Sequence, residues 1–140
     1  MLEDGSTFVG EFLRGKKEGQ GVYEWADGTR YEGEWANNQI EGIGFYNWPD
    51  GRRFEGSWQK NKLHGRGVYV WPDGRVYDGE YSEDKKQGFG IYVWPDGKKY
   101  EGGWENGKQH GTGQFTNQQG KSRVGEWVKG ERVRWVPHLE

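Results

Sequence analysis

The glycines of this chain recur with a period of 23 residues, and this period constrains the fold more than any other feature. Of the 26 glycines, only Gly103 is out of phase. One series has a glycine in every unit: Gly10, Gly33, Gly56, Gly79, Gly102 and Gly125. A fixed period of about 20–50 residues predicts an array of like units that bury their faces only against their neighbours. The expected functional element is therefore the surface of the array rather than one enclosed pocket.

Each unit has the pattern of a β-hairpin. Tyr-Glu-Gly-Glu-Trp at residues 31–35 alternates in polarity as a strand does, residues 36–41 are a polar loop, and residues 42–48 are a second strand candidate. Pro-Asp-Gly at residues 49–51 is turn chemistry. The middle of the polar loop always has a residue type that tolerates positive φ: Gly15, Asn38, Asn61, Asp84, Gly107 and Gly130. The sequence therefore predicts an all-β chain of hairpins joined by tight turns.

Side-chain alternation places aromatic residues and glycines on one face of the predicted sheet. Glycine weakens a strand, so we expect the strand glycines of this face, such as Gly56 and Gly79, to make room for a neighbouring ring. Valine at Gly56 or Gly79 should therefore be more destabilising than valine at Gly103. Stacked rings, each burying roughly 150–250 Å², would form the core of a thin sheet.

The same face forms an aromatic and glycine trough, which we expect to bind a helix or an extended segment of a partner protein. The residues expected to line it are Tyr46, Trp48, Trp58, Tyr69, Trp71, Tyr81, Tyr92, Trp94 and Trp104. In the alternative interpretation, the rings only pack against each other. The opposite face has a row of acidic residues, among them Glu55, Asp78 and Glu80, which is either a solvated surface with ion pairs or a site for a basic partner.

Lysines recur at the loops and predict a basic edge. Lys62, Lys85, Lys86 and Lys108 would meet an anionic phospholipid or an acidic partner there. Acidic residues lie in the same loops, so we expect weak contact at most. Ordinary solvated loop lysines are the other interpretation.

Composition narrows the function classes. Net charge is −2, so nothing global favours nucleic acid. The chain has no cysteine, and no apolar run approaches the roughly 20 residues of a membrane span. We therefore expect a cytoplasmic protein, with cytoskeletal or membrane association left open.

Catalysis and metal binding are not expected. Nearly every Asp, Glu and His is a repeat position rather than part of a unique cluster. His64 and His110 are two repeats apart, which separates them by roughly 19 Å in a sheet. We expect no enzyme activity, no metal and no cofactor.

The Tyr-Glu-Gly-Glu-Trp motif, followed by a polar loop, Gly-x-Gly and Asp-Gly, resembles the MORN repeat (membrane occupation and recognition nexus). Residues 31–35 and 100–104 are close matches to its start, and residues 64–67 and 110–113 to its middle. The resemblance implies an elongated, single-layer, twisted antiparallel sheet. It also implies a scaffold in cytoskeletal or membrane-apposed assemblies, with a homodimer through terminal repeats in some members. The alternative that it implies is a lipid-targeting or regulatory module of a larger enzyme such as a lipid kinase.

The array is expected to form a single domain over residues 5–136, followed by a tail over residues 137–140. Its repeats would span residues 8–30, 31–53, 54–76, 77–99 and 100–122, with a degenerate unit at 123–136. Residues 133–136 depart from the pattern, which is typical of a cap. An interface is the other interpretation.

Overall fold

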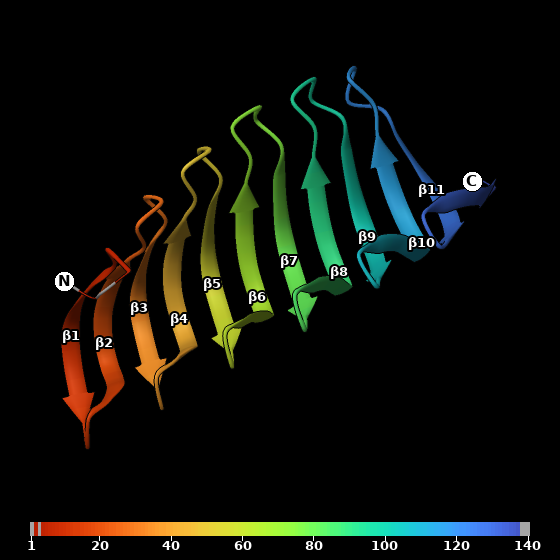
Figure 1. Ribbon diagram of the computed structural model, residues 1–140. Coiled ribbons are helices and arrows are strands. Elements are labelled where there is room, and N and C mark those ends of the chain that lie inside the picture. The colour runs from red at the N-terminus through yellow and green to blue at the C-terminus, as the bar shows by residue number, and fades with distance from the viewer. Residues whose placement is uncertain (1, 3, 138–140) are drawn as a thin grey trace.

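The chain folds into one antiparallel β-sheet that is a single layer thick (Figure 1). The computed structural model describes residue 2 and residues 4–137; the expected tail lies outside them, except for Pro137. Twelve strands follow one another in chain order, and each pairs with its sequence neighbours. The predicted all-β hairpin array is therefore confirmed. Among the described residues, no helix is long and apolar enough to cross a membrane.

Six hairpins make up the sheet; the first five each pair a seven-residue strand with a nine-residue strand, and the last pairs a seven-residue strand with a five-residue strand. Their strands are β1 (Thr7–Leu13), β2 (Lys16–Glu24), β3 (Arg30–Ala36), β4 (Gln39–Asn47), β5 (Arg53–Gln59), β6 (Lys62–Val70), β7 (Val76–Ser82), β8 (Lys85–Val93), β9 (Lys99–Glu105), β10 (Lys108–Thr116), β11 (Ser122–Val128) and β12 (Glu131–Trp135).

The turn inside each hairpin is shorter than the sequence predicted. Ala36 pairs with Gln39, so only two residues connect β3 to β4. Both have left-handed backbone, with φ of 52° at Asn37 and 66° at Asn38. Two positive φ angles define the tight turn whose twist matches that of paired strands. The expected polar loop over residues 36–41 is therefore wrong in length, because β4 already begins at Gln39.

The turn between hairpins is built on the recurring Asp-Gly. After β4, the Asp50 carboxylate accepts a hydrogen bond from the Arg52 backbone amide at 3.0 Å. Gly51 has φ of 99°, and its amide donates to the Trp48 carbonyl. This backbone geometry explains the Asp-Gly without a bound cation.

A β-bulge in each of the first five hairpins sets the register of its two strands. In β3 and β4, Gly33 pairs with Gly44 and Trp35 pairs with Ile40, with the irregularity between the two pairs. The Glu34 carboxylate accepts a hydrogen bond from the Ile43 amide at 2.9 Å across this bulge. The bulge therefore brings Ile40 opposite Trp35, on the aromatic face.

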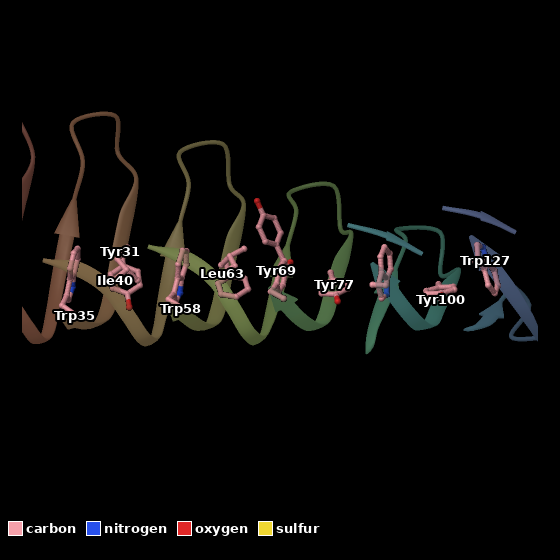
Figure 2. Close-up of a cluster of buried hydrophobic side chains, with 12 residues drawn as sticks. Tyr31, Trp35, Ile40, Trp58, Leu63, Tyr69, Tyr77, Tyr100 and Trp127 are labelled. Carbon is pink, nitrogen blue, oxygen red and sulfur yellow. The ribbon is translucent and has the colours of Figure 1, made fainter. Parts of the chain in front are cut away.

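The core is a row of buried rings along one face (Figure 2). Tyr31, Tyr77 and Tyr100 have no exposed surface and Phe54 is 1% exposed. Each ring lies across a pair of facing glycines. A Cβ built on Gly67 would lie 2.5 Å from Phe54 Cε2, which leaves no room for a side chain. The expectation that glycines make room for rings is confirmed for the pairs that face each other within a hairpin, such as Gly56 and Gly67. It does not hold for Gly42, which faces the Glu34 side chain, or for Gly28, where a Cβ would meet nothing within 4 Å.

Gly103 does not behave as the sequence suggested. A Cβ there would collide with the backbone carbonyl oxygen of His110, because Gly103 lies at the bulge between β9 and β10. Being out of phase with the other glycines therefore does not make this position permissive, and the expectation of a mild substitution is wrong.

The last unit completes the sheet as a sixth hairpin. β11 and β12 are joined by Lys129 and Gly130, both with positive φ, as in the preceding units. Trp135 packs edge-on against Trp127, with ring centroids 6.1 Å apart. Arg134 stands where the preceding second strands have glycine and binds Glu126 through two hydrogen bonds.

Candidate partner-binding groove

A continuous row of aromatic rings runs across the hairpins beside the buried core. We call it the outer row: Tyr23, Trp25, Tyr46, Trp48, Tyr69, Trp71, Tyr92, Trp94 and Phe115. Each tryptophan is the residue directly after the second strand of its hairpin, where the chain enters the turn. Ring centroids are 5.2 Å apart from Trp48 to Tyr69 and 4.4 Å apart from Tyr69 to Trp71. The repeat thus supplies two rings per unit at near-contact spacing.

A groove of about 650 Å³ lies between the outer row and the hairpin tips. It is lined by Lys17, Tyr23, Trp25, Trp35, Asn38, Ile40, Tyr46, Trp48, Trp58, Asn61, Leu63, Tyr69 and Asp84. Most of this lining is aromatic, whereas the tip side is polar. The groove therefore offers apolar contact with hydrogen-bonding groups along one side, as peptide-binding sites do.

The structure divides the residues expected to line the trough into two sets. Tyr46, Trp48, Trp71, Tyr92 and Trp94 are partly buried and belong to the outer row.

The other set is buried: Trp58, Tyr69, Tyr81 and Trp104 are each 8% exposed or less. Three of them, Trp58, Tyr81 and Trp104, pack edge-on against the fully buried rings of the core. The half-buried set has surface to offer a partner, while the buried set mainly supports the fold.

The floor of the trough is formed by one side chain per hairpin that the sequence analysis did not place on this face. These floor residues are 23 apart: Lys17, Ile40, Leu63, Lys86, Gln109 and Arg132. Ile40 is 5% exposed and Leu63 is 7% exposed. These residues could have been found by extending the strand alternation towards the N-terminus from the glycines of the second strand, as from Gly42 to Ile40. The long loop that the sequence analysis assumed hid this continuation.

Lys86 points into the aromatic face and is held among four rings. Its Nζ lies 5.4 Å from the Tyr77 ring centroid and between 5.6 and 6.0 Å from those of Trp71, Tyr92 and Trp104. Such cation–π contacts are worth about 0.5–2 kcal/mol each, depending on desolvation. Burial lowers the pKa of Lys86, and the positive charge of Arg75 lowers it further.

The expectation that Lys86 lies on an exposed basic edge is therefore corrected. Lys85 and Lys86 are consecutive strand residues, so their side chains point to opposite faces. Lys85 and Lys108 are exposed, whereas Lys62 is paired with Glu83 at 3.3 Å. The lysine edge is thus less basic than the sequence suggested.

Lys17 repeats the arrangement of Lys86 near the other end. Its Nζ lies 5.3 Å from the Phe8 ring centroid, 5.5 Å from that of Tyr23 and 5.9 Å from that of Trp35. Among the ion pairs of the described residues, none involves Lys17 or Lys86. Two ammonium groups are therefore held by aromatic faces alone.

Arginines brace the tryptophans of the outer row. The Arg52 guanidinium lies 4.9 Å from the Trp48 ring centroid and donates hydrogen bonds to Asp50 Oδ2 at 2.8 Å and to the Tyr69 hydroxyl at 3.0 Å. Arg75 repeats this arrangement over Trp71, at 5.0 Å. A stacked and hydrogen-bonded guanidinium restricts the ring, so these tryptophans are held in a fixed orientation.

A second, smaller hollow of about 270 Å³ lies at the other end of the array. It is lined by Trp94, Gln109, Phe115, Trp127, Arg132 and Trp135. The guanidinium of Arg132 lies 4.4 Å from the Trp135 ring centroid. Lys86, between this hollow and the main groove, separates two apolar stretches of one face.

The opposite face mixes acidic and apolar side chains. Glu55 pairs across the strands with Val68, and Asp78 with Ile91. Phe45 is 49% exposed there. Several of its charged residues are paired internally, as Lys99 is with Glu101 at 2.8 Å. Among the described residues, no group of three or more His, Cys, Asp or Glu could hold a metal ion.

Comparison with known proteins identifies the repeat. The family model for the MORN repeat matches residues 8–30, 31–52, 54–74, 77–99 and 100–122. A search of curated proteins found no match.

Among solved structures, the SAS-4 (dCPAP) TCP domain of Drosophila melanogaster, in complex with a proline-rich motif of Ana2 (dSTIL), aligns with 98% of this chain and 94% of its own. The identity is 11% and the TM-score is 0.36, so this distant likeness does not bear on the ligand. The five repeat matches cover most of the chain, which therefore belongs to the MORN-repeat family.

Proposed function

We propose that this chain is a non-catalytic protein-interaction module that binds a segment of a partner protein in the groove. MORN repeats are generally non-catalytic modules, which is consistent with this proposal. The context that we propose is a cytoplasmic scaffold in a cytoskeletal or membrane-apposed assembly. A homodimer through the terminal repeats stays a prediction.

The observation that carries the proposal is that the outer row is half-buried, except for Tyr69, which is 8% exposed. If the rings served only the fold, the outer row would be as buried as Tyr31 or Tyr77, which have no exposed surface. Trp48 and Trp71 instead keep part of their surface exposed although arginines hold them in place. Rigid, partly exposed aromatic residues with an apolar groove beside them are typical of residues that dominate protein interfaces.

A peptide library displayed on phage, selected on the intact chain, tests this proposal. Selected peptides should lose affinity for a Trp48→Ala/Trp71→Ala double variant by about tenfold or more. The matched control, Ile43→Ala/Phe45→Ala, removes two exposed apolar side chains from the opposite face and should leave binding unchanged. Circular dichroism confirms that both variants fold. The reverse pattern would assign recognition to the opposite face and refute the groove.

Contact with anionic phospholipid is the second function that we weigh, as in a lipid-targeting or regulatory module of a larger enzyme. Exposed Lys85 and Lys108 favour it. The ion pair between Lys62 and Glu83, together with the inward position of Lys86, leaves fewer lysines for a membrane surface. We therefore rank lipid contact below protein binding.

A further inference from the structure

We propose that the groove selects a proline-rich partner segment in the polyproline II conformation, with two acidic residues about nine positions apart. This inference rests on the proposed function and specifies its ligand. It is carried by the spacing of the outer row and by the charges of the floor residues.

The spacing of the repeat matches the pitch of a polyproline II helix. Neighbouring strands lie about 4.8 Å apart, so two strands, one repeat, span about 9.6 Å. The contact of Trp48 with Tyr69 of the next hairpin, at 5.2 Å between ring centroids, recurs one repeat later between Trp71 and Tyr92 at 5.7 Å. A polyproline II helix rises about 3.1 Å per residue with three residues per turn, or about 9.3 Å per turn. One turn of such a segment, laid across the strands, therefore meets one hairpin.

Other regular conformations do not keep this register. An α-helix covers one repeat in about 6.4 residues, which leaves it about 80° short of two full turns, so its contact face rotates away within two or three hairpins. A β-strand covers one repeat in about three residues and alternates its faces, so successive hairpins would meet opposite sides of the segment. Only the polyproline II segment presents the same edge to every tryptophan of the outer row, and aromatic-lined grooves suit proline rings.

The floor residues add a charge pattern to this register. Lys17 lines one end of the groove and Lys86 lies just beyond its other end, three repeats away, or about 29 Å across the strands. Nine residues of polyproline II span about 28 Å, so carboxylates nine positions apart would reach both ammonium groups. Between the two lysines the floor is apolar, formed by Ile40 and Leu63.

The two ammonium groups favour an acidic partner because none of the ion pairs among the described residues uses them. Lys86 is partly withdrawn from water by its four rings, so a partner carboxylate would be drawn to it strongly. Asp84, which lines the groove near Leu63, uses its carboxylate to accept a hydrogen bond from the Leu63 amide at 2.7 Å. A third acidic residue of the partner segment, opposite Leu63, would be repelled by the Asp84 carboxylate. The acidic residues of the segment are therefore restricted to the two positions opposite Lys17 and Lys86.

Fluorescence anisotropy with synthetic peptides tests the inference on the full chain. The probe is a labelled proline peptide of about 15 residues with two glutamates nine positions apart. The comparison peptides place the glutamates six apart, replace both with lysine, or set the same glutamates in an alanine-based helical sequence. The nine-residue spacing should bind best, with affinity at least about tenfold above each comparison peptide.

The chain itself provides matched variants for the floor. Lys86→Leu introduces the residue type that Leu63 has at the same position of the preceding repeat, so the sheet should stay folded. The affinity for the two-glutamate peptide should fall about tenfold. Lys85→Leu removes the neighbouring exposed lysine and should change nothing. Equal binding of the six- and nine-residue spacings, or an unaffected Lys86→Leu variant, would overturn the charge pattern.

The failure of this inference is distinguishable from failure of the proposed function. Stronger binding by the helical peptide, lost in Trp48→Ala/Trp71→Ala, would refute the polyproline II conformation and keep the groove as the binding site. If every peptide selected from the library bound the Trp48→Ala/Trp71→Ala variant as tightly as the unchanged chain, the groove itself would be refuted as the binding site.

Discussion

The side chain of Asn61 accepts a hydrogen bond from the backbone amide of Ile40, one hairpin earlier, at 2.8 Å. Asn38 does the same for Lys17, and Asp84 for Leu63. Each of these residues is the second turn residue of its hairpin, with positive φ. The second turn residue therefore closes its own hairpin through its backbone conformation. Its side chain also hydrogen-bonds the tip of that hairpin to the preceding hairpin.

Gly107 occupies the same position without a side chain to complete this bond. Its amide donates to the Lys86 carbonyl at 3.0 Å, but the Lys86 amide lacks the side-chain acceptor that the equivalent residues have. We predict that Gly107→Asn stabilises the chain by about 0.5–1.5 kcal/mol, because Asn tolerates φ of 82° and supplies the acceptor. Urea unfolding is the measurement. Gly107→Ala, which introduces backbone strain at φ of 82° and adds no acceptor, should instead be destabilising.

Gly67 provides a test of ring packing. A Cβ there meets the Phe54 ring, so Gly67→Ala should cost about 1–3 kcal/mol in the free energy of unfolding. In the double variant with Phe54→Leu, the smaller side chain should recover part of this loss. Gly28→Asn is the control, since nothing lies near the Cβ position of Gly28 and Asn tolerates its φ of 95°. Equal destabilisation at both glycines would contradict ring packing as the cause.

Trp58 and Trp48 should separate stability from binding. Trp58 is 6% exposed, and its replacement by alanine should cost about 3–5 kcal/mol of stability. Trp48 is only partly buried, so alanine there should cost clearly less stability while removing groove surface. Thermal unfolding of the two variants, measured beside peptide binding, checks the division. A Trp48→Ala variant as unstable as Trp58→Ala would place both rings in the core.

Alkaline pH should unfold the protein through its buried tyrosines. Burial raises the pKa of Tyr100 to about 12, and burial together with the charge of Glu80 raises the pKa of Tyr77 still further. In the unfolded chain, tyrosine has a pKa of about 10. The unfolded state therefore loses its protons first, so this stabilisation is complete below pH about 10 and falls as pH rises towards about 12.

Tyrosinate absorbance and circular dichroism should be recorded together against pH. They should show that the buried tyrosines, whose pKa is raised, ionise as the sheet unfolds. Tyr77→Phe, which copies Phe54 at the equivalent position, should shift the unfolding midpoint to higher pH. Its cost at neutral pH is the hydrogen bond from the Tyr77 hydroxyl to the Glu80 carbonyl, 2.9 Å long. Ionisation of every tyrosine with no loss of sheet signal would contradict this coupling.

Vesicle sedimentation tests the lipid alternative. At about 0.15 M ionic strength, charges more than about 8 Å apart are largely screened, so we expect weak binding to vesicles containing phosphatidylserine. Lys85→Glu/Lys108→Glu should abolish what remains. Tight binding that these substitutions remove would promote lipid contact above protein binding.

The period made the fold predictable because glycines and rings recur at fixed positions, and this fixes both the hairpin and its aromatic face. What escaped prediction depends on two local details. The turn at Asn37 and Asn38 needs positive φ at both residues, yet only the second was recognised, so the strand was started too late.

That one error concealed Ile40 and Leu63 as floor residues and left Lys86 in a loop. The bulge that puts the His110 carbonyl against Gly103 has no sequence signal, because other units place Glu or Ser at that position. The division of the trough residues into buried and half-buried sets does not follow the repeat position, since Tyr46 and Tyr69 are equivalent residues and only Tyr69 is in the buried set. Alternation assigns a ring to a face and cannot supply its degree of burial.

The pairing of each strand with only its sequence neighbours makes the length of the groove a matter of copy number. Duplication of one 23-residue unit would leave every described strand paired with a neighbour of the same kind. Each added copy would extend the aromatic face by about 9.6 Å and introduce one new floor side chain. Duplication of a unit can thus lengthen the partner segment that the array accommodates. A single substitution of the new floor residue can then change the charge that it recognises, while the packing of the other repeats stays the same.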